Sequence, residues 1–560
     1  MLRFAVMCNG MELAAWEADC VKKLLVLENI ELALIIIDRE STSVASNWSR
    51  IKRVGWYGWY LYNLLFIKHQ TKAMRPCSIA SFGDKAPQLQ CSVTQKGKFS
   101  QYLSEEDIKT IRNYNLDFIL RFGFGIIRGD ILNAARFGIW SFHHDDEEEY
   151  RGGPPGFWEI YYNDPVTGAI LQRLTDRLDG GIILKKGCIR TNLISYVRNR
   201  DAIHFVSAVW PVQVCQDILN HRTDYLEAAP SRSTAPVFKA PNNIQMAVFT
   251  GKIVWRLVSR VWRAIFFYYQ WNIGVVNQPI HMFLAPNKDP AIRWLPPPPL
   301  HSFRADPFAI VRGSGLDVLF EEYRYRNSRG FISTMCIADS HISNSNIAID
   351  LGVHTSYPYL IVNDGEIYCI PEMSAKREVC LYRAKEFPSS WVKVATIIDN
   401  FAGVDSTVIQ YRDRWWLMTM NADRDAISEL YIWHAPNLVG PWEPHQLNPV
   451  KVDVRSSRPA GTPFTHEGKL YRPVQDCSYS YGQRVVLNHI LELTPARFHE
   501  ETVGAVDSDP RGPYPDGLHT LSGIGNRTLI DGVRKVFVGR SIPVIWYKFK
   551  RIKPIVNLLW

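Results

Sequence analysis

GIWSFHHDDEEEYRGGPPGFW, the stretch from Gly138 to Trp158, joins an apolar run to an acidic run and a glycine–proline turn. The apolar run ends at His143 and has the length of a buried strand. Acidic runs are usually solvated, so we expect the acids from Asp145 to Glu149 to form an exposed loop. The stretch therefore predicts a strand whose carboxyl end carries the polar side chains Ser141 and His143.

The same texture extends through roughly the first 190 residues, where short apolar runs alternate with helical spacing such as that of Glu12–Glu28. The predicted strands are Arg3–Cys8, Glu31–Ile37, Leu116–Phe122, Gly138–His143, Ala169–Leu174 and Ile182–Lys186. Strands that alternate with helices predict βαβ units and an open twisted α/β sheet of the Rossmann type. Chemistry in such sheets gathers at the carboxyl ends of the strands, which is where His143 lies.

The sequence pattern changes after Trp271, where β-rich segments recur with a loose period of roughly fifty residues. Each copy has a polar or proline-containing start, an apolar strand, a turn and an aromatic-rich second strand. The five copies begin near Asp306, Ser356, Val404, Arg458 and Asp516. A period of this length built from hairpins is typical of propeller blades, so we predict an all-β five-bladed β-propeller.

These patterns divide the chain into four parts. Residues 1–225 form the α/β domain, 226–270 a linker with a basic amphipathic helix, 271–545 the propeller, and 546–560 a basic and aromatic tail. The linker proper is the polar stretch AAPSRSTAPVFKAPNN, residues 228–243.

A helical pattern covers Ile244–Trp271, with an apolar and aromatic face opposite a basic one. The basic face holds Lys252, Arg256, Arg260 and Arg263, spaced by three or four residues. The C-terminal tail, WYKFKRIKPIVNLLW, has a similar mixture. Both segments either pack within the chain or rest on an anionic membrane surface, through residues 252–263 and the tail.

Length, charge and cysteine usage narrow the class of protein. A chain of 560 residues needs more than one core, and a net charge of +9 over that length does not indicate a nucleic-acid partner. The 10 cysteines form no Cys-x-x-Cys pair, which favours reduced thiols. No signal peptide and no membrane-spanning window is recognised. We expect a cytoplasmic protein, soluble or peripheral to the membrane, with its oligomeric state left open.

A candidate catalytic pair joins His143 to Asp179, which lies in the turn RLDGGIIL. Such a pair at neighbouring strand ends can act as base and orienter, with the aspartate fixing the imidazole. We expect no metal, because His143, His144 and Asp145 are adjacent and neighbours on a strand point to opposite faces.

The order of the short motifs resembles the 10-formyltetrahydrofolate-dependent formyltransferases, the group of methionyl-tRNA and sugar N-formyltransferases. The pieces that carry the resemblance are Ser141-Phe-His143, Tyr150–Pro155, Thr167-Gly168, Leu178–Gly181 and the upstream LRFGFGIIRGDIL at Leu120–Leu132. The resemblance implies His143 as general base, Asp179 as its partner, and Ser141 in the place of the family's oxyanion-stabilising asparagine. It also implies folate contacts at Phe122, Gly123, Ile126, Arg151, Gly152, Gly153 and Pro154.

The second half resembles the five-bladed fold of family 43-type glycosidases and the propeller-like domain beside some glycosyltransferases. Asp306 and Asp405 begin blades, as acids do in those glycosidases, whereas the fourth blade begins with Arg458. The resemblance implies a carbohydrate-binding domain rather than an active hydrolase. Asp306, Asp405, Arg458 and His519 are the candidate ligand contacts.

The leading hypothesis is an enzyme that moves a formyl group from 10-formyltetrahydrofolate to an amine. The acceptor is an amino sugar or nucleotide-sugar of glycan biosynthesis, which the propeller recognises. A non-catalytic glycan-binding protein, or a degenerate glycosidase-like protein with an inactive formyltransferase scaffold, is the alternative.

Overall fold

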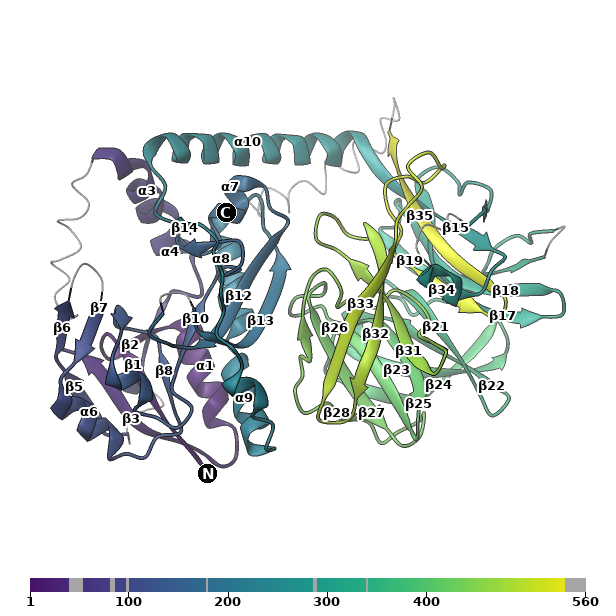
Figure 1. The fold of residues 1–560 in the computed structure, drawn as a ribbon. Coiled ribbons are helices and arrows are strands. Elements are labelled where there is room, and N and C mark those ends of the chain that lie inside the picture. The colour runs from purple at the N-terminus through teal and green to yellow at the C-terminus, as the bar shows by residue number, and fades with distance from the viewer. Residues whose placement is uncertain are drawn as a thin grey trace. The chain divides into compact units, whose positions relative to one another are not determined.

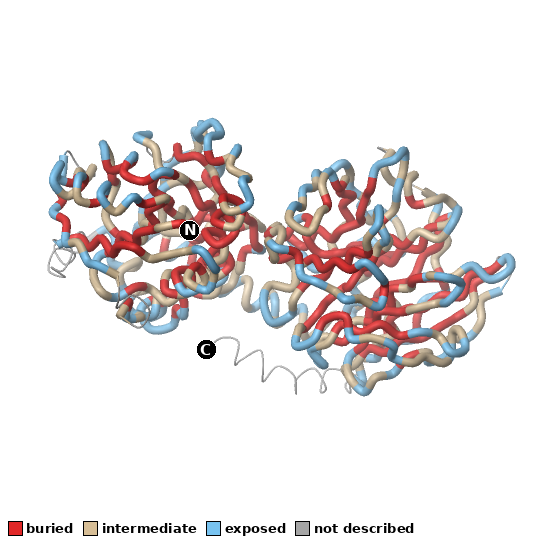
Figure 2. The backbone as a smooth tube through the Cα atoms, turned by 90° about the horizontal axis from the view of Figure 1, so that it is seen from below, coloured by how far each residue is buried: buried red, intermediate tan, exposed pale blue. Residues whose placement is uncertain are grey.

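The computed structural model describes residues 1–39, 54–80, 86–96, 100–177, 180–285, 290–338 and 341–538. The chain divides into two compact units, Met1–Leu257 and Val258–Trp560, which we describe separately as unit 1 and unit 2. In each unit the buried residues follow the strands, and the exposed ones gather in the turns (Figure 2). The tail at 546–560 lies outside the described residues.

Unit 1 is built on one seven-stranded sheet with the order β13-β12-β10-β8-β1-β3-β5 (Figure 1). The strands are β1 (Leu2–Cys8), β3 (Ile30–Asp38), β5 (Gln88–Cys91), β8 (Phe118–Arg121), β10 (Ile139–His143), β12 (Val166–Arg173) and β13 (Ile182–Arg190). The part from β10 to β5 is parallel, and β12 and β13 are antiparallel. Unit 1 therefore has the open α/β sheet that the sequence predicts.

The strands of this sheet are apolar on both faces, because helices and turns cover both. On one face Ala5 and Met7 belong to the same core cluster as Ile108 and Ile111 of α6 (Glu105–Arg112). On the opposite face Phe4 stacks on Phe118, whose ring stacks in turn on Trp140. The remaining large helices are α1 (Ala15–Leu25), α8 (Tyr196–Ser207) and α9 (Trp210–Leu219).

Shorter elements complete unit 1. Small sheets join β2 (Glu12–Ala14) to β4 (Pro76–Ser78), β6 (Val93–Lys96) to β7 (Ser100–Leu103) and β9 (Ile126–Ile127), and β11 (Arg151–Gly152) to β14 (Val237–Phe238). The short helices are η1 (Val54–Trp56), α3 (Tyr57–Tyr62), η2 (Asn63–Ile67), α4 (Lys68–Gln70), η3 (Asp130–Asn133), α7 (Trp158–Tyr162) and η4 (Asp224–Glu227). Because β14 lies in the stretch 228–243, part of the sequence interpreted as a linker is tied into unit 1.

The long helix α10 (Asn243–Phe266) contains the point that divides the two units. Its helical spacing was expected to continue to Trp271. The helix ends at Phe266 instead, because Phe267 begins strand β15 (Phe267–Val276) and pairs with Phe537.

The described residues of unit 2 form five antiparallel sheets after the end of α10. In chain order these are β15 with β16 (Ile292–Trp294), β34 (Leu521–Ile524) and β35 (Arg527–Phe537); β17 (Ser302–Arg312) to β20 (Asn346–Ile349); β21 (Ser356–Asn363) to β24 (Ser390–Asp399); β25 (Gly403–Tyr411) to β29 (Lys451–Val452); and β30 (Phe464–His466) to β33 (Phe498–Val506). The inner members are β18 (Gly315–Arg324), β19 (Arg329–Ile337), β22 (Glu366–Glu372), β23 (Glu378–Glu386), β26 (Arg414–Asn421), β27 (Glu429–Ala435), β28 (Glu443–Pro444), β31 (Lys469–Asp476) and β32 (Arg484–Leu493).

The predicted repeats coincide with these sheets. Asp306 lies in β17, Ser356 begins β21, Val404 lies in β25, and Arg458 precedes β30. The fifth copy leads into β34 and β35, which share a sheet with β15 from the beginning of unit 2. Short helices η5 (Ile280–Leu284) and η6 (Ser374–Lys376) lie in the connections.

Candidate functional site

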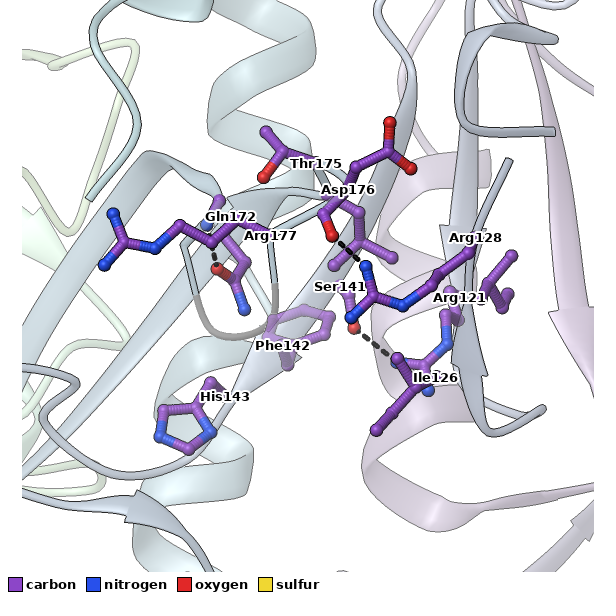
Figure 3. Close-up of a pocket in the computed structure, with 13 residues that line it drawn as sticks. Arg121, Ile126, Arg128, Ser141, Phe142, His143, Gln172, Thr175, Asp176 and Arg177 are labelled. Atoms are coloured by element: carbon purple, nitrogen blue, oxygen red, sulfur yellow. Dashed lines mark hydrogen bonds between the residues drawn. The ribbon is translucent and has the colours of Figure 1, made fainter. Parts of the chain in front are cut away.

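A pocket of about 190 Å³ opens in unit 1 at the carboxyl ends of β8 and β10 (Figure 3). Ser141 and His143 line it, so the polar end of the predicted strand does face a cavity. The other lining residues are Arg121, Ile126, Ile127, Arg128, Phe142, Gln172, Leu174, Thr175, Asp176, Arg177 and Gly181. This is where an open α/β sheet places its ligands.

Ser141 accepts a hydrogen bond from a partly buried arginine. The Arg121 guanidinium donates from Nη1 to Ser141 Oγ at 2.8 Å, and from Nη2 to the carbonyls of Gly125 at 2.6 Å and Phe124 at 3.1 Å (Figure 3). Burial lowers the pKa of Arg121 to about 10. Within the described part of the chain no carboxylate forms an ion pair with it. The arginine is therefore held by neutral acceptors alone.

His143 makes a contact that fixes its tautomer. Its Nε2 lies 3.2 Å from the carbonyl oxygen of Tyr150. Because a carbonyl oxygen only accepts, Nε2 carries the proton in this contact. Asp179, the predicted partner of His143, lies outside the described residues, so the pair stays a prediction.

Only one of the predicted folate contacts lines the pocket, namely Ile126. Phe122 packs against Trp16, and Gly123 lies so close to the chain after β1 that a Cβ would meet Asn9 at 2.4 Å. Arg151, Gly152, Gly153 and Pro154 lie at β11, where Arg151 and Gly152 pair with β14, and none of the four is among the lining residues. Gly152 serves close backbone packing, because a Cβ there would meet the Phe238 carbonyl oxygen at 2.2 Å.

The acidic run after His143 is only in part the exposed loop that the sequence predicts, because Asp145 and Glu147 are buried whereas Glu148 and Glu149 are exposed. Asp145 is buried and accepts from the backbone N–H of Gly156 at 2.7 Å, and burial raises its pKa to about 8. Burial, with the neighbouring Asp145, also raises the pKa of Glu159, so neutral pH favours the protonated form of both carboxyls. Glu147 is buried beside Lys186.

The lining of the pocket is cationic. The pocket is lined by three arginines, Arg121, Arg128 and Arg177, and by one acid, Asp176. Arg128 donates to the backbone carbonyl of Asp176 rather than to its carboxylate. Guanidinium groups in a partly dry cavity favour an anionic ligand such as a phosphate or carboxylate.

Unit 2 carries a second candidate site, built on a repeated backbone feature. Asp306, Tyr357 and Asp405 all have positive φ, at 52°, 42° and 48°. Each lies at a register shift in the first strand of its sheet, β17, β21 or β25. Non-glycine residues persist in this conformation only where their surroundings fix them, and such positions cluster at functional sites.

Asp306 and His519, both predicted ligand contacts, meet in one buried cluster with Asp531. His519 Nδ1 lies 2.7 Å from Asp531, and its Nε2 lies 3.7 Å from Asp306. Burial alone would lower the pKa of His519, but Asp531 and Asp306 raise it. Burial raises the pKa of Asp306 to about 6, although His519 opposes the shift. These three side chains could also ligate a metal, since their ligand atoms lie within 4.8 Å of one another.

The other two predicted contacts form an ion pair. Arg458 Nε donates to Asp405 Oδ2 at 2.6 Å, and Gln475 Nε2 donates to the same oxygen at 3.0 Å. The Glu372 carboxylate accepts from the Asp405 backbone N–H at 3.2 Å. Burial and the Asp405 charge raise the pKa of Glu372 to about 8, so it keeps its proton at neutral pH.

Aromatic side chains cover this cluster. Trp271 stacks on His519 with ring centroids 4.0 Å apart, and Tyr481 meets the same imidazole edge-on. The Arg458 guanidinium lies over the Tyr481 ring at 4.8 Å, while Tyr481 remains 44% exposed. Trp415 and Trp416 are buried in core clusters.

Sequence reasoning did not single out Asp531, Glu321 or Tyr481 at this site. Asp531 and Glu321 are buried acids that directly follow the apolar runs Leu529–Ile530 and Val318–Phe320, and that pattern was the available signal. Burial raises the pKa of Glu321, and the nearby acids, Asp306 first, raise it further. Tyr481 had no comparable signal.

Comparisons with known proteins match parts of the chain. Residues 299–512, all within unit 2, match the family described as "Glucosamine inositolphosphorylceramide transferase 1, N-terminal". Over 209 residues the chain is 37% identical to the glucosamine inositolphosphorylceramide transferase 1 of Oryza sativa subsp. japonica. That match covers 36% of this chain and 28% of the rice protein, so the chain spans only a minor part of this relative.

A shorter match, 31% identical over 85 residues, is to the methionyl-tRNA formyltransferase of Agathobacter rectalis and covers 15% of this chain and 27% of that protein. A family 117 glycoside hydrolase from Zobellia galactanivorans has a TM-score of 0.31 at 13% identity, covering 42% of this chain and 85% of its own. Glycinamide ribonucleotide transformylase 1 from Symbiobacterium toebii has a TM-score of 0.27 at 14% identity, covering 40% and 89%. Scores this low carry no argument about function.

The sequence matches overturn the predicted chemistry. The relatives matched over 209 or more residues are named glucosamine inositolphosphorylceramide transferases, so formyl transfer to an amine is wrong, and so is 10-formyltetrahydrofolate as co-substrate. The pocket of unit 1 offers a physical reason. Ser141 replaces the asparagine of formyltransferases, and its hydroxyl accepts from Arg121. The oxyanion-stabilising carboxamide is therefore missing.

Proposed function

We propose that unit 2 binds the sugar of a glycoconjugate, and that the chain takes part in transferring a sugar to a lipid-linked acceptor. The match of residues 299–512 to a family named for glucosamine transfer to inositolphosphorylceramide supports both the sugar and the lipid. The observation that carries the proposal is the buried charged cluster around Asp306 and Asp405, capped by the half-exposed ring of Tyr481.

We infer further that the five sheets of unit 2 are the blades of a propeller with this cluster at their centre. Side chains from all five sheets meet there. Asp306 N–H donates to Asp531, Tyr357 N–H donates to Asp306, and Gln475 donates to Asp405. These residues lie in β17, β35, β21, β31 and β25.

The chemistry of the cluster suits a polyhydroxylated ligand. Glu372 carries a proton at neutral pH, and the Arg458 guanidinium places a positive charge against the exposed ring of Tyr481. Tyr481 offers a ring on which the apolar face of a sugar can stack. Because Asp306 and Asp405 are each paired with a cation, they position donors rather than act as free carboxylates.

Two measurements on the full chain test this function. Calorimetric titration with glucosamine, N-acetylglucosamine and inositol tests recognition. Incubation with UDP-linked glucosamine donors and inositolphosphorylceramide in detergent micelles, followed by mass spectrometry of the lipid, tests transfer. Binding without a mass gain would reduce the function to recognition, and no binding of any sugar at millimolar concentration would refute it.

A matched pair of tyrosine variants places the sugar. Tyr481→Ala should weaken sugar binding several-fold, from the loss of about 1 kcal/mol of stacking. Tyr479→Ala, two residues away and also exposed, should leave the affinity unchanged. Equal effects of the two substitutions would show that the sugar does not contact the cluster.

A further inference from the structure

Unit 1 exposes a band of large apolar side chains along α3, η2 and the first half of α10, which we call the apolar face. Its members are Leu61, Leu64, Leu65, Phe66, Ile244, Val248, Val254 and Trp255, each between 40% and 77% exposed. Exposed leucines and tryptophans that gather over neighbouring elements usually mark an interaction surface.

The rotation of α10 is fixed by its basic side chains, which point into unit 1. Lys252 Nζ donates to the Tyr161 carbonyl at 2.6 Å. Arg256 donates from Nη1 to the Leu193 carbonyl at 2.8 Å and from Nη2 to the Ile160 carbonyl at 2.9 Å. In the first half of the basic stripe at 252–263, Lys252 and Arg256 therefore contact unit 1. Trp255 is exposed to solvent instead.

The two helical segments form one surface, because α3 packs on the start of α10 (Figure 1). Gly58 N–H donates to Asn243 Oδ1 at 2.8 Å, and a Cβ on Gly58 would meet Met246 Cβ at 3.2 Å. Tyr62 meets Phe249 edge-on. The exposed row continues along the same helix through Val258 and Trp262.

The two segments that carry the apolar face have charged side chains of a single sign. Neither residues 54–72 nor residues 243–266 contain an aspartate or glutamate. The exposed basic residues of these segments include Lys68, Lys72, Arg260 and Arg263. Apolar and tryptophan side chains flanked by Lys and Arg, without acids, are the composition of helices that lie in a bilayer interface beside anionic headgroups.

We propose that the apolar face docks unit 1 on the surface of an anionic phospholipid bilayer. In the described part of the chain no helix combines the length and the hydropathy needed to cross a bilayer, so α10 lies in the interface plane. Docking would bring the chain to lipid acceptors, but it rests on the apolar face and the basic residues around it, and it stands or falls independently of sugar binding at the cluster around Asp306 and Asp405.

Co-sedimentation of the full chain with vesicles tests the docking. Phosphatidylcholine vesicles that contain about a third phosphatidylserine should bind it, and pure phosphatidylcholine vesicles should bind it much less. Trp255→Ser should weaken partitioning about ten-fold, whereas Trp255→Phe should retain it, since an exposed ring contributes by burial. Arg260→Gln should weaken it about five-fold, from about 1 kcal/mol per basic residue at the surface.

Leu65→Ser and Leu300→Ser form the matched control. Both leucines are exposed, but Leu300 lies in unit 2, so only Leu65→Ser should reduce vesicle binding. Circular dichroism melting confirms that each variant is folded. No binding to anionic vesicles, or binding that Trp255→Ser and Leu65→Ser leave unchanged, would overturn the proposal. A dimer in sedimentation velocity that Trp255→Ser dissociates would assign the face to a second copy instead.

Discussion

The two candidate sites differ in how their charges are balanced. In unit 2, Asp405 is matched by Arg458, and His519 lies between Asp531 and Asp306. In unit 1, Arg121 and Arg128 of the pocket donate to neutral acceptors, namely the Ser141 hydroxyl and backbone carbonyls. A balanced cluster stabilises the fold and presents donors to a neutral ligand such as a sugar. A pocket whose cations have no carboxylate partner favours the binding of an anion.

The largest effect is expected from breaking the balance in unit 2. Arg458→Met leaves Asp405 buried without its cation, which should destabilise unit 2 by about 3–5 kcal/mol in urea unfolding. Arg455→Met is the matched control, because its ion pair with Asp453 is exposed and should cost less than about 1 kcal/mol. Equal costs would show that Arg458 and Asp405 are not a buried pair in solution.

A second effect is on the pH dependence of unit 2. Folded Glu372 keeps its proton to about pH 8, against an ordinary pKa of 4.5, so between these values the folded state binds more protons and stability falls as pH rises. The raised pKa of His519 acts in the same direction: its contribution is complete below about pH 6.5 and is lost as pH rises through the folded pKa.

Urea midpoints measured from pH 5 to pH 9 check this dependence. Glu372→Gln should flatten the decline, because glutamine does not titrate. Glu366→Gln, an exposed position on the same strand, should leave the profile unchanged. A wild-type midpoint that rises with pH over this range would contradict the assigned protonation of Glu372 and His519.

The smallest effect is expected in unit 1. Ser141→Ala removes one acceptor of the Arg121 guanidinium, which should cost about 1 kcal/mol of stability. Ser104→Ala removes the N-cap of α6 instead and should cost a similar amount without touching the pocket. The stabilities of the two variants should therefore differ only when an anion is present. Phosphate at about 10 mM, a concentration at which weak sites fill, should stabilise the wild type more than Ser141→Ala.

The fold was largely readable from sequence because it repeats simple periods. Continuous apolar runs at β1 and β3 indicated a buried parallel sheet, and copies of a hairpin indicated the sheets of unit 2. The site was less readable, since it depends on contacts between distant residues. The sequence near Ser141 does not indicate that Arg121 is its hydrogen-bond partner. The acidic run does not indicate that Asp145 is buried against Glu159.

The motif at Ser141 and His143 located a pocket but gave the wrong chemistry. A motif is inherited with the fold, whereas function follows the side chains that surround it. Here the change from asparagine to serine was visible in sequence, but its meaning required the guanidinium of Arg121 beside it. Likewise, helical spacing showed that α10 has a basic and an apolar face, but only the contacts of Lys252 and Arg256 showed which face is exposed.

The pairing of β15 with β35 has a consequence for synthesis and for protein engineering. The first sheet of unit 2 is complete only when residues 527–537 reach residues 267–276, so this unit cannot finish folding on the ribosome until residue 537 has emerged. The family match at 299–512 contains neither strand. A fragment cut to those limits would expose unpaired strand edges and aggregate, so a recombinant version of unit 2 should include residues 267–537 at least.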